Sequence, residues 1–211
     1  MINPVKFSLS LCLIILTLTS CSSKNGGSSQ DVQAPVQPLS CIAVIPAVTS
    51  VDKDDTVRYE EARLLEKGAS YATTVLVDEL SGNAKVRLIN SAMMSDAVRE
   101  VSGGVSGTIK ALGEKVNCEG VLITTVRRFV QRDGTELAVD TPASADFKMV
   151  LRHAPTGAML WSADFQETQE PLLSNIFSYS KAQKRGFHWV TAEELLQQGL
   201  TQRLAECPYL Q

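Results

Sequence analysis

The run Gly120-Val-Leu-Ile-Thr-Thr-Val-Arg-Arg-Phe-Val-Gln131 sets the centre of the expected fold. Its first half is apolar on both faces, which is typical of a strand buried in the middle of a sheet. Its second half carries Arg127 and Arg128, so we expect that end of the strand to run past the cover of the helices. The remaining elements can be placed outward from this strand.

The sequence before this strand alternates between short aliphatic runs and helical stripes. In the longest stripe, apolar residues recur at spacings of three and four, which favours one amphipathic helix. The expected elements are a strand over Cys41–Ala47, a helix over about Tyr59–Leu80, a strand over Lys85–Ile89, a helix from Asn90 or Ser91 to about Val101, a turn over Ser102–Gly107 and a helix over Thr108–Val116.

The sequence after this strand predicts a hairpin. Asp133-Gly134 is a turn signal, and two strands follow over about Ala143–His153 and Ala158–Glu167, joined at Pro155-Thr-Gly157. Apolar and polar residues alternate along both strands, which indicates an antiparallel pair with one buried face.

The last element is predicted from a capping box. Thr191 fits the N-cap and Glu194 the third helical position, and leucines continue the helix to Cys207. The element order is βαβαβββα, whose parallel part requires right-handed crossovers. We therefore expect the α/β class: a single two-layer or three-layer sandwich with a mixed sheet.

The amino terminus has the pattern of a lipoprotein signal peptide. Lys6 precedes the apolar run Phe7–Leu18, whose length fits a secretion signal and is short for a membrane span. Leu18-Thr-Ser-Cys21 then resembles a lipobox, in which small residues fit the signal peptidase and the cysteine thiol carries the lipid. Residues 1–20 are the expected signal peptide, with lipidation at Cys21.

The residues after the lipidated cysteine predict where the protein resides. Residue 22 is Ser22 rather than Asp, which in a Gram-negative bacterium implies an outer-membrane lipoprotein facing the periplasm. Ser, Gly, Gln and Pro dominate up to Leu39, so residues 21–39 are expected to be the lipidated cysteine and a disordered tether. Residues 40–211 are the expected periplasmic α/β domain, held at the bilayer by its acyl anchor.

Composition limits the classes of function. Loss of Lys6 with the signal peptide changes the formal net charge of −3 to −4, and a mildly acidic protein gives no electrostatic footprint for nucleic acid. No cofactor motif is recognised, and the two histidines give a zinc site weak support.

Three cysteines remain in the expected mature domain: Cys41, Cys118 and Cys207. In an oxidising compartment at most one internal disulfide forms among three thiols. The expected topology brings all three to one end of the domain. Because a helix end has more freedom than two neighbouring strands, we expect Cys41–Cys207, with Cys118–Cys207 as the alternative. A third possibility is that all three are small buried hydrophobes.

Several motifs, in this order, resemble those of the periplasmic α/β domains of the TolB amino-terminal, CsgG and LpoB type. They are IAVIPA, KVRLIN, KALGEKVNCEGVLITTV and the hairpin APTGAMLWSADF. The usual "alanine-aspartate" at the start of one strand is Cys118-Glu119 here. The resemblance runs from about Cys41 to Cys207 and implies a fold and an envelope role in assembly or scaffolding.

Catalysis has little support in the sequence. GxSxG is absent, His153 precedes a turn, and His188 lies in an aromatic segment before the last helix. We therefore expect a protein that is not an enzyme.

The segment Leu172–Val190 combines aromatic residues with cations, which are the residue types that anchor protein interfaces. The expected partner-binding residues are Phe177, Tyr179, Lys184, Arg185, Phe187, His188 and Trp189, although these aromatics could equally form a satellite core. The resulting hypothesis is a membrane-anchored, non-catalytic binding or scaffold module in cell-envelope assembly, with an envelope protein of unknown identity as its partner. The alternatives are an activator of a peptidoglycan synthase and a periplasmic hydrolase.

Overall fold

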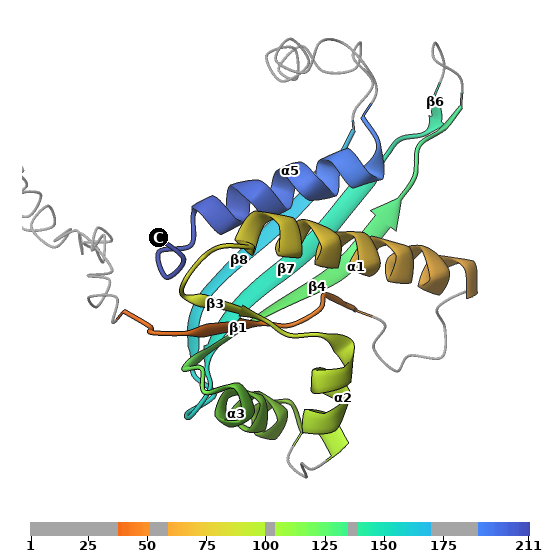
Figure 1. Ribbon diagram of the computed structural model, residues 1–211. Coiled ribbons are helices and arrows are strands. Elements are labelled where there is room, and N and C mark those ends of the chain that lie inside the picture. The colour runs from red at the N-terminus through yellow and green to blue at the C-terminus, as the bar shows by residue number, and fades with distance from the viewer. Residues whose placement is uncertain (1–37, 51–58, 100–103, 135–138, 170–189) are drawn as a thin grey trace, which may run out of the picture. The chain divides into compact units, whose positions relative to one another are not determined.

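The computed structural model describes residues 38–50, 59–99, 104–134, 139–169 and 190–211. Figure 1 shows one mixed sheet with helices on both faces, which confirms the α/β sandwich. The strands of this sheet are β1 (Ile42–Val44), β2 (Val48–Thr49), β3 (Val86–Leu88), β4 (Gly120–Val130), β7 (Ser144–His153) and β8 (Met159–Thr168). A separate short pair consists of β5 (Asp133–Gly134) and β6 (Val139–Thr141). The helices are α1 (Tyr59–Leu80), α2 (Ser91–Arg99), α3 (Gly104–Val116) and α5 (Ala192–Ala205).

The strand order is β3-β1-β4-β7-β8, with β4 in the middle as its apolar first half predicts. The parallel pairs are β1 with β3 and β1 with β4, whereas β7 is antiparallel to both β4 and β8. The short strand β2 also pairs with β4, at Thr125 and Val126.

The face covered by α1 and α5 contains the larger core. Leu65, Ala69, Ala72 and Leu76 of α1 are buried there, as the spacing of apolar residues predicts. Helix α5 starts with the predicted capping box: the Glu194 amide donates to Thr191 Oγ1 at 3.1 Å, and the Thr191 amide donates to Glu194 Oε2 at 2.7 Å.

The opposite face carries a smaller core under α2 and α3. It includes Ala43 of β1, Val121 of β4 and Leu112 of α3, but no residue of β7 or β8. Within the described residues, the helices therefore leave the β7–β8 half of this face without a core.

Three local expectations were inexact. The turn expected at Ser102–Gly107 is partly helix, because α3 begins at Gly104, where a φ of +65° suits glycine. The first strand ends at Val44, before Pro46, which has no amide hydrogen for a sheet. Asp133-Gly134 was expected to be a turn, but both residues pair with β6.

Candidate functional site

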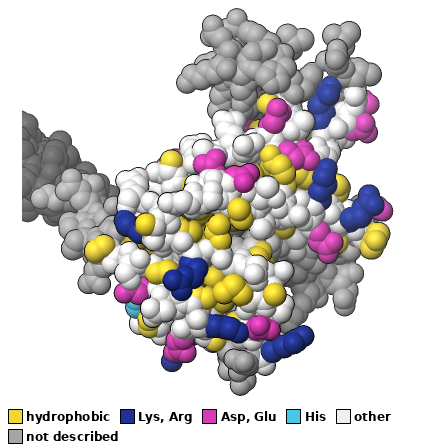
Figure 2. Space-filling view, in the orientation of Figure 1, with side chains coloured by type: hydrophobic (Ala, Val, Ile, Leu, Met, Phe, Trp, Pro, Cys, Tyr) yellow, Lys and Arg dark blue, Asp and Glu magenta, His cyan; other side chains and the backbone are white. Residues whose placement is uncertain are grey.

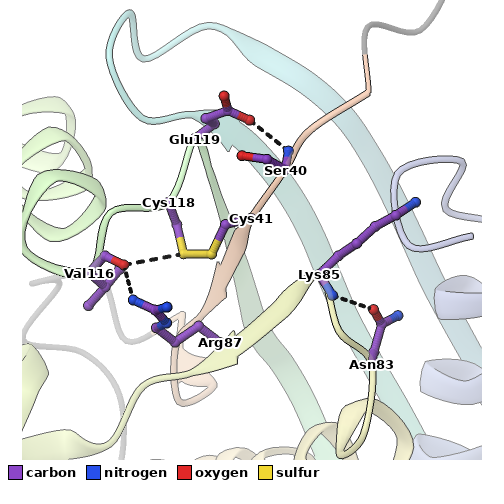
Figure 3. Close-up of a disulfide and its surroundings, with 8 residues drawn as sticks. All are labelled: Ser40, Cys41, Asn83, Lys85, Arg87, Val116, Cys118 and Glu119. Atoms are coloured by element: carbon purple, nitrogen blue, oxygen red, sulfur yellow. Dashed lines mark hydrogen bonds between the residues drawn. A yellow bond between two sulfur atoms is a disulfide. The ribbon is translucent and has the colours of Figure 1, made fainter.

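The cysteine pairing differs from the expected one (Figure 3). The disulfide joins Cys41 to Cys118, whose Cα atoms lie 4.6 Å apart, and Cys207 is a buried free thiol. The prediction of a Cys41–Cys207 pair, with Cys118–Cys207 as its alternative, was wrong. Cys41 lies one residue before β1 and Cys118 two residues before β4, so the parallel pairing of these strands brings the two Cα atoms within disulfide range.

Cys207 lies on the other face of the sheet. Its side chain belongs to the core under α1 and α5, whereas Cys118 belongs to the core under α2 and α3. The chain end after Cys207 does reach the start of β3, where Asn83 Nδ2 donates to the Leu210 carbonyl at 3.0 Å. Cys207 therefore lies toward the end of the domain where all three thiols were expected, but the sheet separates it from Cys41 and Cys118. Burial raises the pKa of Cys207, which keeps it protonated and poorly reactive.

The disulfide is part of a clasp where the described chain enters the sheet, formed by Leu39, Ser40, Cys41, Cys118 and Glu119. The Ser40 amide donates to Glu119 Oε2 at 2.7 Å. The amides of Glu119 and Gly120 each donate to the Cys41 carbonyl at 3.1 Å. Leu39 is buried, and its Cδ1 lies 2.7 Å from where a Cβ on Gly120 would be, so a side chain at that position would displace it. Several independent contacts therefore hold this point of entry.

A second feature lies at the opposite end of β4. An open pocket of about 530 Å³, called the β4 hollow below, separates the start of α1 from the end of β4. Its helix side is formed by Glu60, Glu61, Leu64 and Leu65. Its strand side is formed by residues 127–130, with Asp146 and Gln166 from the neighbouring strands.

The floor of the β4 hollow is apolar. Leu65 and Phe129 are buried there, and Leu64 is half-buried. Gly68 lets the Phe129 ring approach α1, because a Cβ at this glycine would lie 2.7 Å from Phe129 Cγ. The bottom of the hollow is therefore lined by hydrophobic side chains.

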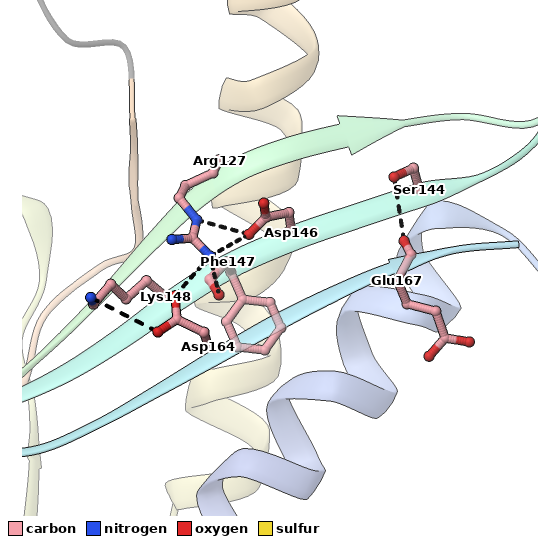
Figure 4. Close-up of polar contacts among 7 residues, drawn as sticks. All are labelled: Arg127, Ser144, Asp146, Phe147, Lys148, Asp164 and Glu167. Atoms are coloured by element: carbon pink, nitrogen blue, oxygen red, sulfur yellow. Dashed lines mark hydrogen bonds and ion pairs between the residues drawn. The ribbon is translucent and has the colours of Figure 1, made fainter. Parts of the chain in front are cut away.

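The outer side of the hollow is organised by a bulge in β4. The register against β7 shifts between Val126 and Arg128, so an extra residue enters β4 at this point. Arg127 is held by Asp146 and Asp164, with N–O distances of 2.6 Å and 2.8 Å (Figure 4). Burial alone would lower the pKa of Arg127, but the hydrogen bonds and charges of these two carboxylates raise it. Arg127 is therefore a fixed cation.

Two charged residues of the hollow differ from Arg127. Arg128 and Glu61 are exposed, and neither makes an ion pair within the part of the chain that the structure describes. Tyr59, next to the hollow on α1, is 79% exposed. Figure 2 shows basic and acidic side chains gathered along the right-hand side of the molecule, where Figure 1 places the start of α1 and the end of β4. This mixture of aromatic, apolar and unpaired charged groups is suited to binding.

Cys21 and the predicted partner-binding set Phe177, Tyr179, Lys184, Arg185, Phe187, His188 and Trp189 lie outside the described residues. His153 is the last residue of β7 and is half-buried, directly before the turn, with Nδ1 at 2.9 Å from Thr156 Oγ1. The described ranges contain no group of three or more His, Cys, Asp or Glu side chains that could hold a metal ion. No described helix is both long and apolar enough to cross a membrane.

The β4 hollow was missed by the sequence analysis. Its one sequence signal was the Arg127–Arg128 doublet, which interrupts an otherwise apolar strand. The doublet was interpreted as the exposed end of the strand, and both side chains are indeed more exposed than the first half of β4. The facing wall of α1 could not be inferred from that pattern.

The chain was also compared with known proteins. No protein-family model and no curated protein matches it. Among solved structures, it is similar to the PelC dodecamer from Paraburkholderia phytofirmans, with 14% identity over 81% of this chain and 89% of that chain and a TM-score of 0.46. It is also similar to the LpoB C-terminal domain from Salmonella enterica, with 18% identity over 65% of this chain and 89% of that chain and a TM-score of 0.37. A third similar structure is the lipoprotein GNA1162 from Neisseria meningitidis, with 16% identity over 70% of this chain and 94% of that chain and a TM-score of 0.40. LpoB is one of the proteins that the sequence resembles, and the likeness transfers no activity to this chain.

Proposed function

We propose that this protein is an outer-membrane lipoprotein, lipidated at Cys21, whose periplasmic domain is a non-catalytic binding or scaffold module in cell-envelope assembly. The observation that carries the proposal is the sequence Leu18-Thr-Ser-Cys21 directly after an apolar signal run. Ser22 supports the outer membrane as the destination, because aspartate at this position is the usual retention signal for the inner membrane.

The fold is consistent with an exported, binding protein. The Cys41–Cys118 disulfide suits an oxidising compartment. The β4 hollow offers apolar and charged groups for contact with a partner. The segment Leu172–Val190 is proposed as a further part of the binding surface because of its aromatic and basic residues.

Lipidation is tested by metabolic palmitate labelling of the full precursor in a Gram-negative host. The wild-type chain should be labelled and processed, and Cys21→Ala should accumulate as an unlabelled precursor. Cys12→Ala is the matched control, because this cysteine lies within the apolar run, and it should be labelled normally. Labelling of Cys21→Ala would reject the anchor.

Partner binding is tested by in vivo crosslinking of the lipidated protein. The double variant Phe187→Ala, Trp189→Ala should retain the wild-type circular dichroism spectrum and lose its crosslinked products. Unchanged crosslinking would remove this segment from the proposed surface, and failure to fold would show that its aromatics are core residues.

A further inference from the structure

The edge of β4 beside the hollow has hydrogen-bonding groups to offer. On that side, β2 pairs only with Thr125 and Val126, and the amide of Ser50 donates to the Val126 carbonyl at 2.9 Å. Strand β4 continues to Val130, while its other side stays paired with β7. Within the described chain, no strand pairs with residues 127–130 along this edge. An unpaired edge is a template for another extended chain.

The bulge and the hollow give this edge two chemically different sides. Phe129 faces the core under α1, so its side of the edge opens into the apolar hollow. Arg127 reaches Asp146 and Asp164 on the opposite face, which no described helix covers at β7 and β8. Successive side chains of an added strand would point alternately to these two sides.

The charges select one type of added strand. On the face of the sheet opposite α1, Arg127 already has two carboxylate partners, whereas Arg128 has none in the described residues. On the helix side, Glu60 pairs with Arg63 at 3.3 Å, the floor is apolar, and Glu61, which has no ion pair in the described residues, repels an acidic side chain. An acidic side chain is thus favoured on one side and an apolar side chain on the other.

We propose that the edge of β4 at residues 127–130, which no described strand pairs beside the hollow, binds together with the β4 hollow an extended segment of a partner protein in which apolar and acidic side chains alternate. The apolar side chains enter the hollow over Leu64 and Phe129, and an acidic side chain meets Arg128. This inference deepens the proposed function, because it names the kind of partner segment that the domain recognises.

The position of this site is suited to a membrane-anchored domain. The clasp lies at the start of β4 and the hollow at its end, about 23–33 Å apart for the seven to ten residues from Gly120 to residues 127–130 at roughly 3.3 Å per residue. The chain enters the described fold at the clasp, so the hollow lies at the end of β4 that is remote from this entry.

The test uses isotope-labelled mature lipoprotein in detergent and a synthetic hexapeptide of alternating Val and Asp. Nuclear magnetic resonance titration should show saturable binding, with amide exchange slowed at least tenfold, on the order expected for new backbone hydrogen bonds, within residues 127–130. A hexapeptide with three Val followed by three Asp has the same composition and should bind far more weakly.

A charge exchange identifies the role of Arg128. Arg128→Glu should weaken binding of the Val-Asp peptide by about five- to tenfold, since it replaces a surface attraction by a repulsion. The same variant should prefer a Val-Lys peptide. Lys110→Glu, an exposed change on α3, is the matched control and should leave the affinity unchanged.

Three results would overturn the inference. They are absence of binding, equal binding of both Val-Asp sequences, and slow exchange in the free protein of those amides of residues 127–130 that do not donate to β7, which would mean that the edge is already covered by this chain or a second copy. None of these results depends on palmitate labelling at Cys21. The peptide titration can therefore reject the binding site without rejecting the lipid anchor, and the labelling experiment can reject the anchor without rejecting the site.

Discussion

Removal of the Cys41–Cys118 disulfide should destabilise the domain strongly. The two cysteines are 77 residues apart, and in the chain-entropy model closing a loop of that size stabilises the folded state by about 4.5 kcal/mol at 25 °C. That free energy corresponds to a decrease of about three powers of ten in the ratio of folded to unfolded protein. For a domain of this size, the melting temperature should fall by roughly 10–15 °C.

The assay is urea denaturation of the full mature lipoprotein in detergent, followed by circular dichroism, with and without dithiothreitol. The double variant Cys41→Ala, Cys118→Ala should be far less stable than the wild type and should not respond to the reductant. Cys207→Ala is the control: it removes a buried thiol outside the disulfide and should remain sensitive to the reductant.

Two outcomes would refute this reasoning. A double variant within about 1 kcal/mol of the oxidised wild type would show that the disulfide contributes little to folding. Alkylation of three thiols in the native mature protein would show that the disulfide is not formed.

Two further substitutions test packing and electrostatics. Gly68→Ala should destabilise the domain by about 1–2 kcal/mol, because the strain of overpacking against the buried Phe129 exceeds the gain of about 1 kcal/mol in helix propensity. Ser70→Ala on the exposed side of α1 is the control and should be neutral or slightly stabilising in the same urea assay. The hydrogen bond from the Ser40 amide lowers the pKa of Glu119, so this carboxylate stabilises the folded state above its unfolded pKa, and the contribution is lost as the pH falls through its folded pKa. Stability measured from pH 7 to pH 2 should therefore show a deficit for Glu119→Gln at neutral pH that disappears in acid, and a deficit that stays constant across this range would contradict the pKa shift.

Regular spacing explains why much of the fold was predictable. In α1, the 3.6-residue period of Leu65, Ala69, Ala72 and Leu76 corresponds to one buried face, and Thr191 with Glu194 marks the start of α5 through local hydrogen bonds alone. Patterns of this kind are set by residues close in sequence, so they do not depend on how the elements are packed.

Features that depend on faces of the sheet were less predictable. Strand direction places Cys41, Cys118 and Cys207 at one end of the domain, but only the packing of α5 decides on which face Cys207 lies. In β8, alternation predicts a buried Met159, yet this residue is 59% exposed, because a register shift between Leu151 and Arg152 pairs Met159 with Arg152, away from the buried face of β7.

The bulge in β4 divides the strand into a part that is held inside the sheet and a part that we propose binds a partner segment. Regular pairing from Gly120 to Val126 holds β4 between β1 and β7, and the disulfide ties the start of that region to the point where the chain enters the fold. Beyond the bulge, β4 pairs on one side only with the strands that the structure describes, and its other edge is the one that we propose for a partner segment. Under the proposed function, a force applied between the partner and the membrane would pass along β4. Because β1 and β7 hold this strand and the clasp covers its first residue, the most strongly supported strand of the domain would carry the load.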